Sequence, residues 1–276
     1  MQPLSKRKRR LYLYGLILVF ALCVPFVMFY ANGYRFKGEQ GFVKTGSVII
    51  SVPETNAVVS LNGEEVGASG FLRHSFYIDD LTPGAYAVLV TREGDYPWHR
   101  TLIVEQELVT DAEAFLVPQE IEPIRLVVST STASSTMRVS PATYEMYRLA
   151  FAPTATSTVL NSAMRQGEIV VVEKGNVLVR HTDPSALPPS RYCTRPSVCV
   201  QEIPIESGKQ QAINAAFFGG GVVYATREGG VFLAEADIRP APVVAPLYSG
   251  RNVDFRIVNG HLIIKDGVAL YEIVEL

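Results

Sequence analysis

Histidine and cysteine are scarce in this sequence, and neither is grouped in a way that would hold a metal. The four histidines stand singly, without metal-ligand spacing: His74, His99, His181 and His261. Cys193 and Cys199 lie close together in a Pro-rich stretch, but no second cysteine pair or nearby histidine completes four ligands. Their spacing leaves a small-loop disulfide and two free thiols equally open. We expect no metal site.

Sequence signatures of common catalytic sites are also missing. The chain has no Gly-x-x-x-x-Gly-Lys-Ser/Thr phosphate loop, no His-Glu-x-x-His zinc helix and no Gly-x-Ser-x-Gly nucleophile elbow. The glycines at 219–221 precede no helix, which a dinucleotide site requires, and are interpreted as a turn. Asp79 and Asp80 are adjacent, so a turn explains them better than a convergent carboxylate pair. These absences predict a protein that is not an enzyme and uses no cofactor.

Basic side chains are a minority outside the N-terminus. Residues 6–10 read Lys-Arg-Lys-Arg-Arg and hold five of the 25 basic residues, whereas all 27 acidic residues lie beyond them. The rest of the chain is therefore acidic. Because duplex affinity depends on basic groups that contact phosphates, we expect no nucleic-acid partner.

A long hydrophobic run follows these cations. Residues 11–30 contain no charged side chain, and about 20 residues of helix cross the roughly 30 Å hydrocarbon core of a bilayer. Because five cations precede the run and only Arg35 and Lys37 closely follow it, the pattern predicts a single-pass membrane protein. Its basic tail, residues 1–10, would remain in the cytoplasm, and the chain beyond about residue 31 would be exported. Aromatic residues suit both interfaces, namely Tyr12, Tyr14, Phe29, Tyr30 and Tyr34.

Three other interpretations of the hydrophobic run compete with the anchor. A cleaved signal peptide would have a shorter apolar core and a small-x-small cleavage site, which residues 26–31 do not offer. A lipoprotein signal would need a small residue before its cysteine, but Leu22 precedes Cys23. A buried helix of a soluble protein rarely lacks a polar stripe for so long. The membrane anchor fits best.

Beyond residues 31–45, interpreted as a Gly-rich stalk, the hydrophobic pattern becomes that of strands. Runs rich in β-branched residues are separated by turn residues such as Asn62-Gly63. Alternation places Tyr86, Val88 and Val90 on one face. The pattern predicts a small antiparallel β-sandwich of six strands, at residues 47–52, 57–61, 71–78, 85–91, 98–105 and 109–117.

Several short motifs in this part occur in the order known from one family. Residues 52–67 read VPETNAVVSLNGEEVG, residues 81–88 read LTPGAYAV, and residues 94–98 read GDYPW. In these motifs residues 46–118 resemble the PEGA domain family, with its Pro-x-x-x-Ala opening, Asn-Gly turn, Leu-x-x-Gly-x-Tyr-x-Val signature and Gly-Tyr-x-x-Trp element. The chain departs from the family by inserting Asp95 and by carrying Ala-Ser-Gly at 68–70, where many members have Thr-Thr-Pro.

The resemblance implies a surface-associated β-sandwich of bacterial and archaeal envelope proteins, usually found beside other domains, and it implies no catalytic residues. Tyr96 and Trp98, the single tryptophan, are candidates for a ligand-binding surface. The alternative is that both pack the sandwich core, as aromatic residues in strands commonly do.

The rest of the chain divides in two. Residues 119–166 carry Ser/Thr-rich segments at 129–136 and 153–158 and are interpreted as a linker or irregular region, exposed around 141–151. The stretch 144–149 fits a helical turn and a strand equally. From residue 167 strands return around glycine turns, as in β-propeller blades. At about 40 to 45 residues per blade, residues 167–276 supply two to three blades, fewer than the four of the smallest usual propellers. Another copy would supply the missing blades, or the domain is open with covered edges.

These features predict an anchored, all-β, non-catalytic extracytoplasmic protein that binds or scaffolds at the cell envelope. Its expected partners are the lipid bilayer and a cell-wall polysaccharide or another envelope protein, with homo-oligomerisation through residues 167–276. The competing hypothesis is an envelope sensor or hydrolase with its site in residues 167–276.

Overall fold

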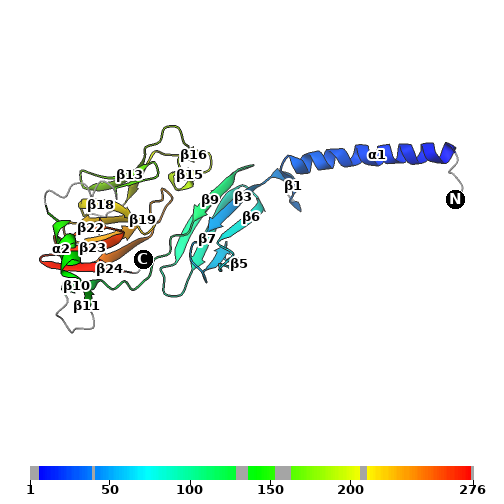
Figure 1. Cartoon of the computed structure of the whole chain (residues 1–276). Coiled ribbons are helices and arrows are strands. Elements are labelled where there is room, and N and C mark those ends of the chain that lie inside the picture. Colours follow the sequence, from blue (N-terminus) through cyan, green and yellow to red (C-terminus); the bar gives the residue numbers. More distant parts are fainter. Residues whose placement is uncertain (1–5, 39–40, 129–135, 153–162, 206–209, 275–276) are drawn as a thin grey trace.

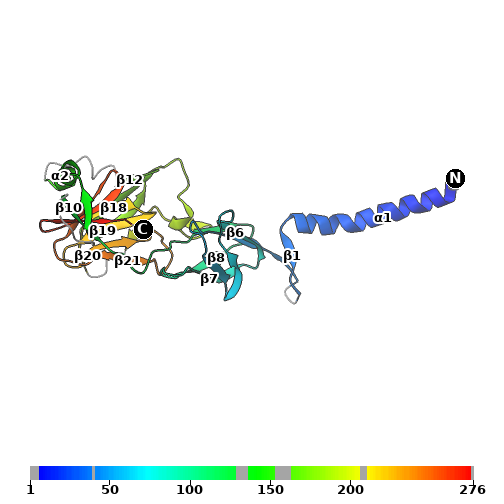
Figure 2. The ribbon, with the colours of Figure 1, turned by 60° about the horizontal axis from the view of Figure 1, so that its bottom comes forward.

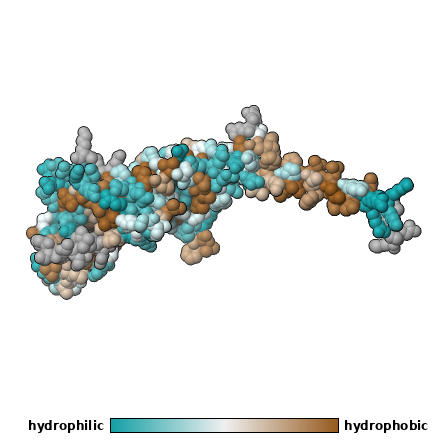
Figure 3. Space-filling model, turned by 90° about the horizontal axis from the view of Figure 1, so that it is seen from above, coloured by the Kyte–Doolittle hydropathy of each residue, from teal (hydrophilic) through white to brown (hydrophobic). Residues whose placement is uncertain are grey.

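The structure is a computed structural model that describes residues 6–38, 41–128, 136–152, 163–205 and 210–274. It is mostly β, and a long helix projects from one end of the elongated chain (Figures 1 and 2). Helix α1 spans Lys6–Ala31 and contains Pro25, and none of its residues is buried. Its apolar surface runs from a hydrophilic N-terminal end toward the β-rich part (Figure 3). The predicted N-terminal apolar helix is confirmed, and among the described residues it alone is long and apolar enough to cross a membrane.

The stretch predicted to be a stalk contains a small hairpin. Strand β1 (Tyr34–Phe36) pairs antiparallel with β2 (Phe42–Lys44), so that Tyr34 lies opposite Lys44 and Phe36 opposite Phe42. The hairpin follows α1 directly. It therefore connects the helix to the sheets that begin at Gly46.

The next part consists of two sheets that face each other across one core. One sheet has the order β6-β3-β9 and the other β5-β4-β7-β8. The strands are β3 (Gly46–Ser51), β4 (Val58–Leu61), β5 (Glu64–Ala68), β6 (Ser75–Leu81), β7 (Gly84–Thr91), β8 (Trp98–Val104) and β9 (Val109–Glu113). Buried residues of both sheets, including Val48, Ile50, Val88 and Val90, form this core. The predicted common face of Tyr86, Val88 and Val90 is confirmed.

This two-sheet part differs from the prediction in two ways. It has seven strands, because the polar stretch that contains Glu64 and Glu65 forms β5 beside β4. It is also not wholly antiparallel, since β9 pairs parallel to β3. A parallel pair needs a long crossover, and here the chain passes through the other sheet between the two strands.

The C-terminal part has three larger sheets. The first is β12-β13-β14-β17, the second β18-β19-β20-β21 and the third β22-β23-β24-β10-β11, and none of them closes into a barrel. Early strands are β10 (Ile124–Val128), β11 (Thr136–Val139), β12 (Met164–Arg165), β13 (Glu168–Glu173), β14 (Asn176–His181) and β17 (Glu202–Ile205). Later strands are β18 (Ala212–Phe218), β19 (Gly221–Thr226), β20 (Gly230–Ala234), β21 (Val244–Tyr248), β22 (Asp254–Val258), β23 (His261–Asp266) and β24 (Ala269–Ile273). Glycine turns join several of them, as predicted.

The second sheet lies between the other two. Every residue of β19 is buried, and successive strand residues point to opposite faces. Val222 and Tyr224 pack with the first sheet, while Val223 and Ala225 pack with the third. The continuous apolar run of this strand is therefore explained by burial on both faces.

The described parts of residues 119–166 contain strands and a helix, where the sequence predicts a linker or irregular region. Strand β10 pairs with β24, the last of the described strands, and helix α2 (Pro141–Leu149) covers the third sheet. Tyr147 of this helix is buried while most of the helix is exposed, so the segment expected to be an exposed linker around 141–151 is a helix that packs on the sheet by one face. The two Ser/Thr-rich segments lie almost wholly outside the described residues. The third sheet thus combines both ends of the C-terminal part.

Candidate functional site

A charged cluster joins the two-sheet part to the C-terminal sheets. The side chains of Trp98, Arg100, Leu102 and Val104 share the buried face of β8, so a charged group lies in phase with core residues. The Trp98 Nε1 donates to Glu235 Oε1 at 2.9 Å. The Arg100 guanidinium donates to the other Glu235 oxygen and to the carbonyl of Ala241. Glu235 belongs to the loop between β20 and β21, so the cluster holds that loop against β8.

Glu235 is buried and has several donors around it. The backbone N–H of Val243 donates to its Oε2 at 3.1 Å. Burial raises the pKa of the Glu235 carboxyl, and the positive charge of Arg100 acts in the opposite direction. A buried carboxylate is tolerated when it is paired and hydrogen-bonded. The cluster is therefore a structural clamp between the two parts of the chain.

The two predicted binding aromatics occupy different environments. The side chain of Trp98 is fully buried, so its ring is not available to a ligand, and the alternative of core packing holds for it. Tyr96 is half-buried and packs against the core shared by the second and third C-terminal sheets. The structure therefore assigns no ligand-binding surface to this pair.

A second candidate site is a cleft beside this clamp. It has a volume of about 500 Å³ and lies between strand β9 and the segment 187–201. Arg239, from the same loop as Glu235, forms its floor by pairing with the buried Asp237 (Nε–Oδ1 2.8 Å) and by donating from Nη1 to the carbonyl of Asp111 (3.1 Å). This last bond satisfies a backbone acceptor on the open edge of β9.

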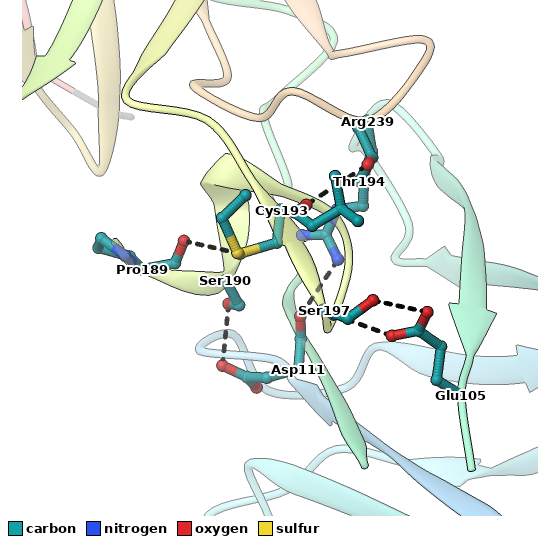
Figure 4. The surroundings of a disulfide bond; sticks show 10 residues. Glu105, Asp111, Pro189, Ser190, Cys193, Thr194, Ser197 and Arg239 are labelled. Carbon is teal, nitrogen blue, oxygen red and sulfur yellow. Dashed lines mark hydrogen bonds between the residues drawn. A yellow bond between two sulfur atoms is a disulfide. The ribbon is translucent and has the colours of Figure 1, made fainter. Parts of the chain in front are cut away.

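The disulfide loop forms the opposite wall of the cleft. Cys193 and Cys199 are bonded to each other and lie in β15 (Cys193–Arg195) and β16 (Val198–Cys199), which pair as a small hairpin. Contacts from this loop and from Ser190 just before it fasten the segment to the two-sheet part (Figure 4). Ser197 donates from its N–H (2.9 Å) and its hydroxyl (2.7 Å) to Glu105, and the Ser190 hydroxyl donates to Asp111 Oδ2 at 3.1 Å.

The cleft offers groups for binding. Its polar lining includes Thr110, Asp111, Ser190, Thr194, Arg195 and Gln201. Ser190 bonds directly to the Asp111 carboxylate, and no histidine lies among the lining residues to serve as a base for this hydroxyl. Hydroxyls, an amide and a guanidinium suit a polar ligand with several hydrogen-bonding groups. No protein-family model and no curated protein matches this chain.

Sequence reasoning missed most of these groups. Arg100 carries a usable signal, because it alternates with Trp98 and Leu102 on one face of a predicted strand. Its partner Glu235 is distant in the sequence, and no local pattern identifies it. The same is true of Asp111 and Ser190, which come from different parts of the chain. The four histidines stay apart, and no group of three or more metal-ligating side chains occurs in the described ranges.

Proposed function

We propose that this protein is a single-pass membrane protein that presents its β-rich part outside the cytoplasm, where it binds or scaffolds without catalysing a reaction. The observation that carries the proposal is helix α1. It has a mean hydropathy of 2.4 over its most apolar stretch and no buried residue, so most of its apolar surface is left uncovered by the described residues. Five cations at its N-terminal end favour a cytoplasmic N-terminus.

Three other features support the proposal. The motifs of residues 46–118 resemble the PEGA domain family, whose members occur in cell envelopes. The disulfide between Cys193 and Cys199 suits an oxidising compartment. The cleft of about 500 Å³ lies where two folded parts meet, a common place for ligand sites. Its polar lining favours a cell-wall polysaccharide or an extended polypeptide as the ligand.

The anchor can be tested with a native probe. Cys23 is the free cysteine of the described chain, and it lies well inside the apolar run. In membranes from the native host, Cys23 should resist a water-soluble maleimide until detergent and denaturant are added. The intact mass of the membrane-bound protein is measured in parallel. Labelling in intact membranes, or a mass that lacks the N-terminal helix, refutes the anchor.

The binding role has its own experiment. Cell-wall glycan fragments are titrated into the purified full chain by calorimetry, and Arg195→Ala, which removes an exposed cation of the cleft, should weaken any binding. A control variant, Arg148→Ala, removes an exposed cation of α2 outside the cleft. A competing function, an envelope sensor or hydrolase, is favoured by the cleft volume alone. Turnover of a glycan or ester substrate by the wild-type chain would overturn the non-catalytic proposal.

The three consecutive C-terminal sheets support a propeller-like arrangement with too few blades to close. Homo-oligomerisation would supply further blades. The mass of the detergent-solubilised chain, corrected for bound detergent, tests this. If the measured mass is that of a monomer, no other copy supplies blades, and the three sheets remain an open arrangement.

A further inference from the structure

The hairpin β1–β2 exposes aromatic side chains beside the end of α1. Phe36 and Phe42 are 68% and 51% exposed, which is unusual for large apolar residues in so small a hairpin. The Phe42 ring stacks on Phe29 of the helix with centroids 5.7 Å apart, and Tyr34 meets Phe29 edge-on at 5.5 Å. The exposed aromatic surface of the hairpin is thus continuous with the apolar surface of α1.

Two ion pairs fasten the hairpin to the two-sheet part, one from each of its faces. Arg35 pairs with Asp80 at 2.7 Å, and Lys44 pairs with Glu107 at 2.9 Å. Arg35 also lies over the Tyr30 ring, 3.8 Å from its centroid, and donates to the Tyr30 carbonyl at 3.0 Å near the helix end. The hairpin therefore contacts both the helix and the two-sheet part, and Arg35 links the two like a bracket.

The length of α1 places this bracket at a defined depth. At 1.5 Å per residue, residues 11–30 span about 30 Å, the thickness of the hydrocarbon core. If residue 11 lies at the inner boundary, Tyr30 reaches the outer one, and the hairpin begins four residues later. A shallow hollow of about 460 Å³ opens there between helix and hairpin, with a lining that includes Phe26, Phe29, Tyr30, Tyr34, Phe36 and Phe42. Aromatic side chains are favoured at this depth of a bilayer.

We infer that the β1–β2 hairpin is a membrane-interface foot: Phe36 and Phe42 insert into the outer boundary of the same bilayer that α1 crosses, lipid fills the hollow, and the ion pairs transmit this fixed position to the two-sheet part. The inference rests on the proposed anchor. Continuity with the lipid-facing helix surface selects lipid over a second copy of the chain as the occupant. The foot gives the protein one orientation on the membrane surface, where a flexible stalk would allow many.

Tryptophan quenching by brominated lipid tests the foot. Three forms of the full chain are compared, the wild type and the variants Phe36→Trp and Phe42→Trp. Each is reconstituted in vesicles of phosphatidylcholine whose acyl chains carry bromine close to the headgroup. The single native tryptophan is buried at the clamp, so it supplies a constant background. The emission added by Trp at position 36 or 42 should fall about twofold against unbrominated vesicles, as expected for side chains buried about 5–10 Å into the boundary.

Phe71→Trp is the matched control. Phe71 is 87% exposed and precedes strand β6. The first residue of β6, Ser75, lies opposite Ser51, whereas Asp80, near the other end of β6, pairs with the hairpin residue Arg35. Position 71 is therefore at the far end of the two-sheet part, and its emission should not change. Far-UV circular dichroism confirms that each variant is folded.

The outcomes separate the foot from the anchor. Failure of the wild-type chain to float with vesicles overturns the anchor and the foot with it. Flotation with no quenching at positions 36 and 42 overturns the foot and leaves the anchor intact.

Discussion

Replacing Arg100 by methionine is the sharpest test of the clamp between the two parts of the chain. Methionine keeps most of the apolar stem but removes the guanidinium. The Glu235 carboxylate, whose side chain is only 7% exposed, would then keep the Trp98 and Val243 donors without a countercharge. Removing one member of a buried ion pair typically costs about 3–5 kcal/mol. We expect Arg100→Met to lower the free energy of unfolding by about this amount at pH 8.

The size of this effect should depend on pH. Burial raises the pKa of Glu235 and Arg100 opposes that rise, so the variant should have a still higher folded-state pKa. Between the unfolded-state pKa of about 4.3 and this higher value, the folded state holds a proton that the unfolded state has released. Stability therefore falls as the pH rises through this window. Arg100→Met should cost less at pH 5 than at pH 8.

The assay is equilibrium unfolding of the full chain in a mild detergent. Trp98 is the only tryptophan, and its emission reports opening of the clamp, while circular dichroism reports the loss of the sheets. Arg148→Met is the control, because that arginine is exposed and pairs with the exposed Glu145. Exposed pairs contribute about 0.5 kcal/mol.

A double-mutant cycle provides the refutation. Arg100→Met combined with Glu235→Gln removes both charges. The double variant should therefore recover about half of the unfolding free energy that Arg100→Met loses, which corresponds to an interaction free energy between the two residues of at least about 2 kcal/mol. Additive effects, or a loss no larger than that of the control, would show that the pair does not clamp the two parts.

The remaining predictions concern backbone constraints. Replacing both Cys193 and Cys199 by serine should cost about 2 kcal/mol, because the bond closes a loop of sequence separation 6; the check is thermal unfolding, in which a reducing agent should shift the wild type but not the variant. Gly230→Ala should cost about 3 kcal/mol or more, since this residue has φ +105° and an added Cβ would overlap the carbonyl oxygen of Tyr248. Gly70→Ala is its control, because a Cβ there meets nothing within 4 Å and the change should stay within about 0.5 kcal/mol; equal midpoints in urea would contradict the steric argument.

Strong periodic signals in the sequence were sufficient for most of the fold. The uncharged run of α1 and the alternation in β7 each follow from one local pattern. Strand β5 escaped prediction because Glu64 and Glu65 interrupt its apolar residues, and its stability comes from pairing with β4. Helix α2 has a local signal in Ser140, which accepts a bond from the Thr143 N–H at 3.0 Å, followed by Pro141 in the first turn.

The candidate site was harder to predict for a physical reason. Its groups come from segments that only tertiary folding brings together: β9, the disulfide loop and the loop after β20. A buried ion pair such as Arg100 with Glu235 can be suspected from one strand of the sequence, because a charged residue stands where the alternation predicts a core residue. The identity of its partner depends on how two separately folded parts dock, and no sequence period encodes this.

The pairing of β10 with β24 has a consequence for biogenesis. If α1 stays in the membrane and the chain beyond it is exported in sequence order, the two-sheet part emerges complete and can fold at once. Strand β10 must wait, because its antiparallel partner β24 comes far later in the sequence. Until then the third sheet presents an unpaired edge, which is a template for aggregation or for a chaperone. Export of β24 would therefore be the event that completes this sheet, and truncation before β24 would leave β10 without its antiparallel partner.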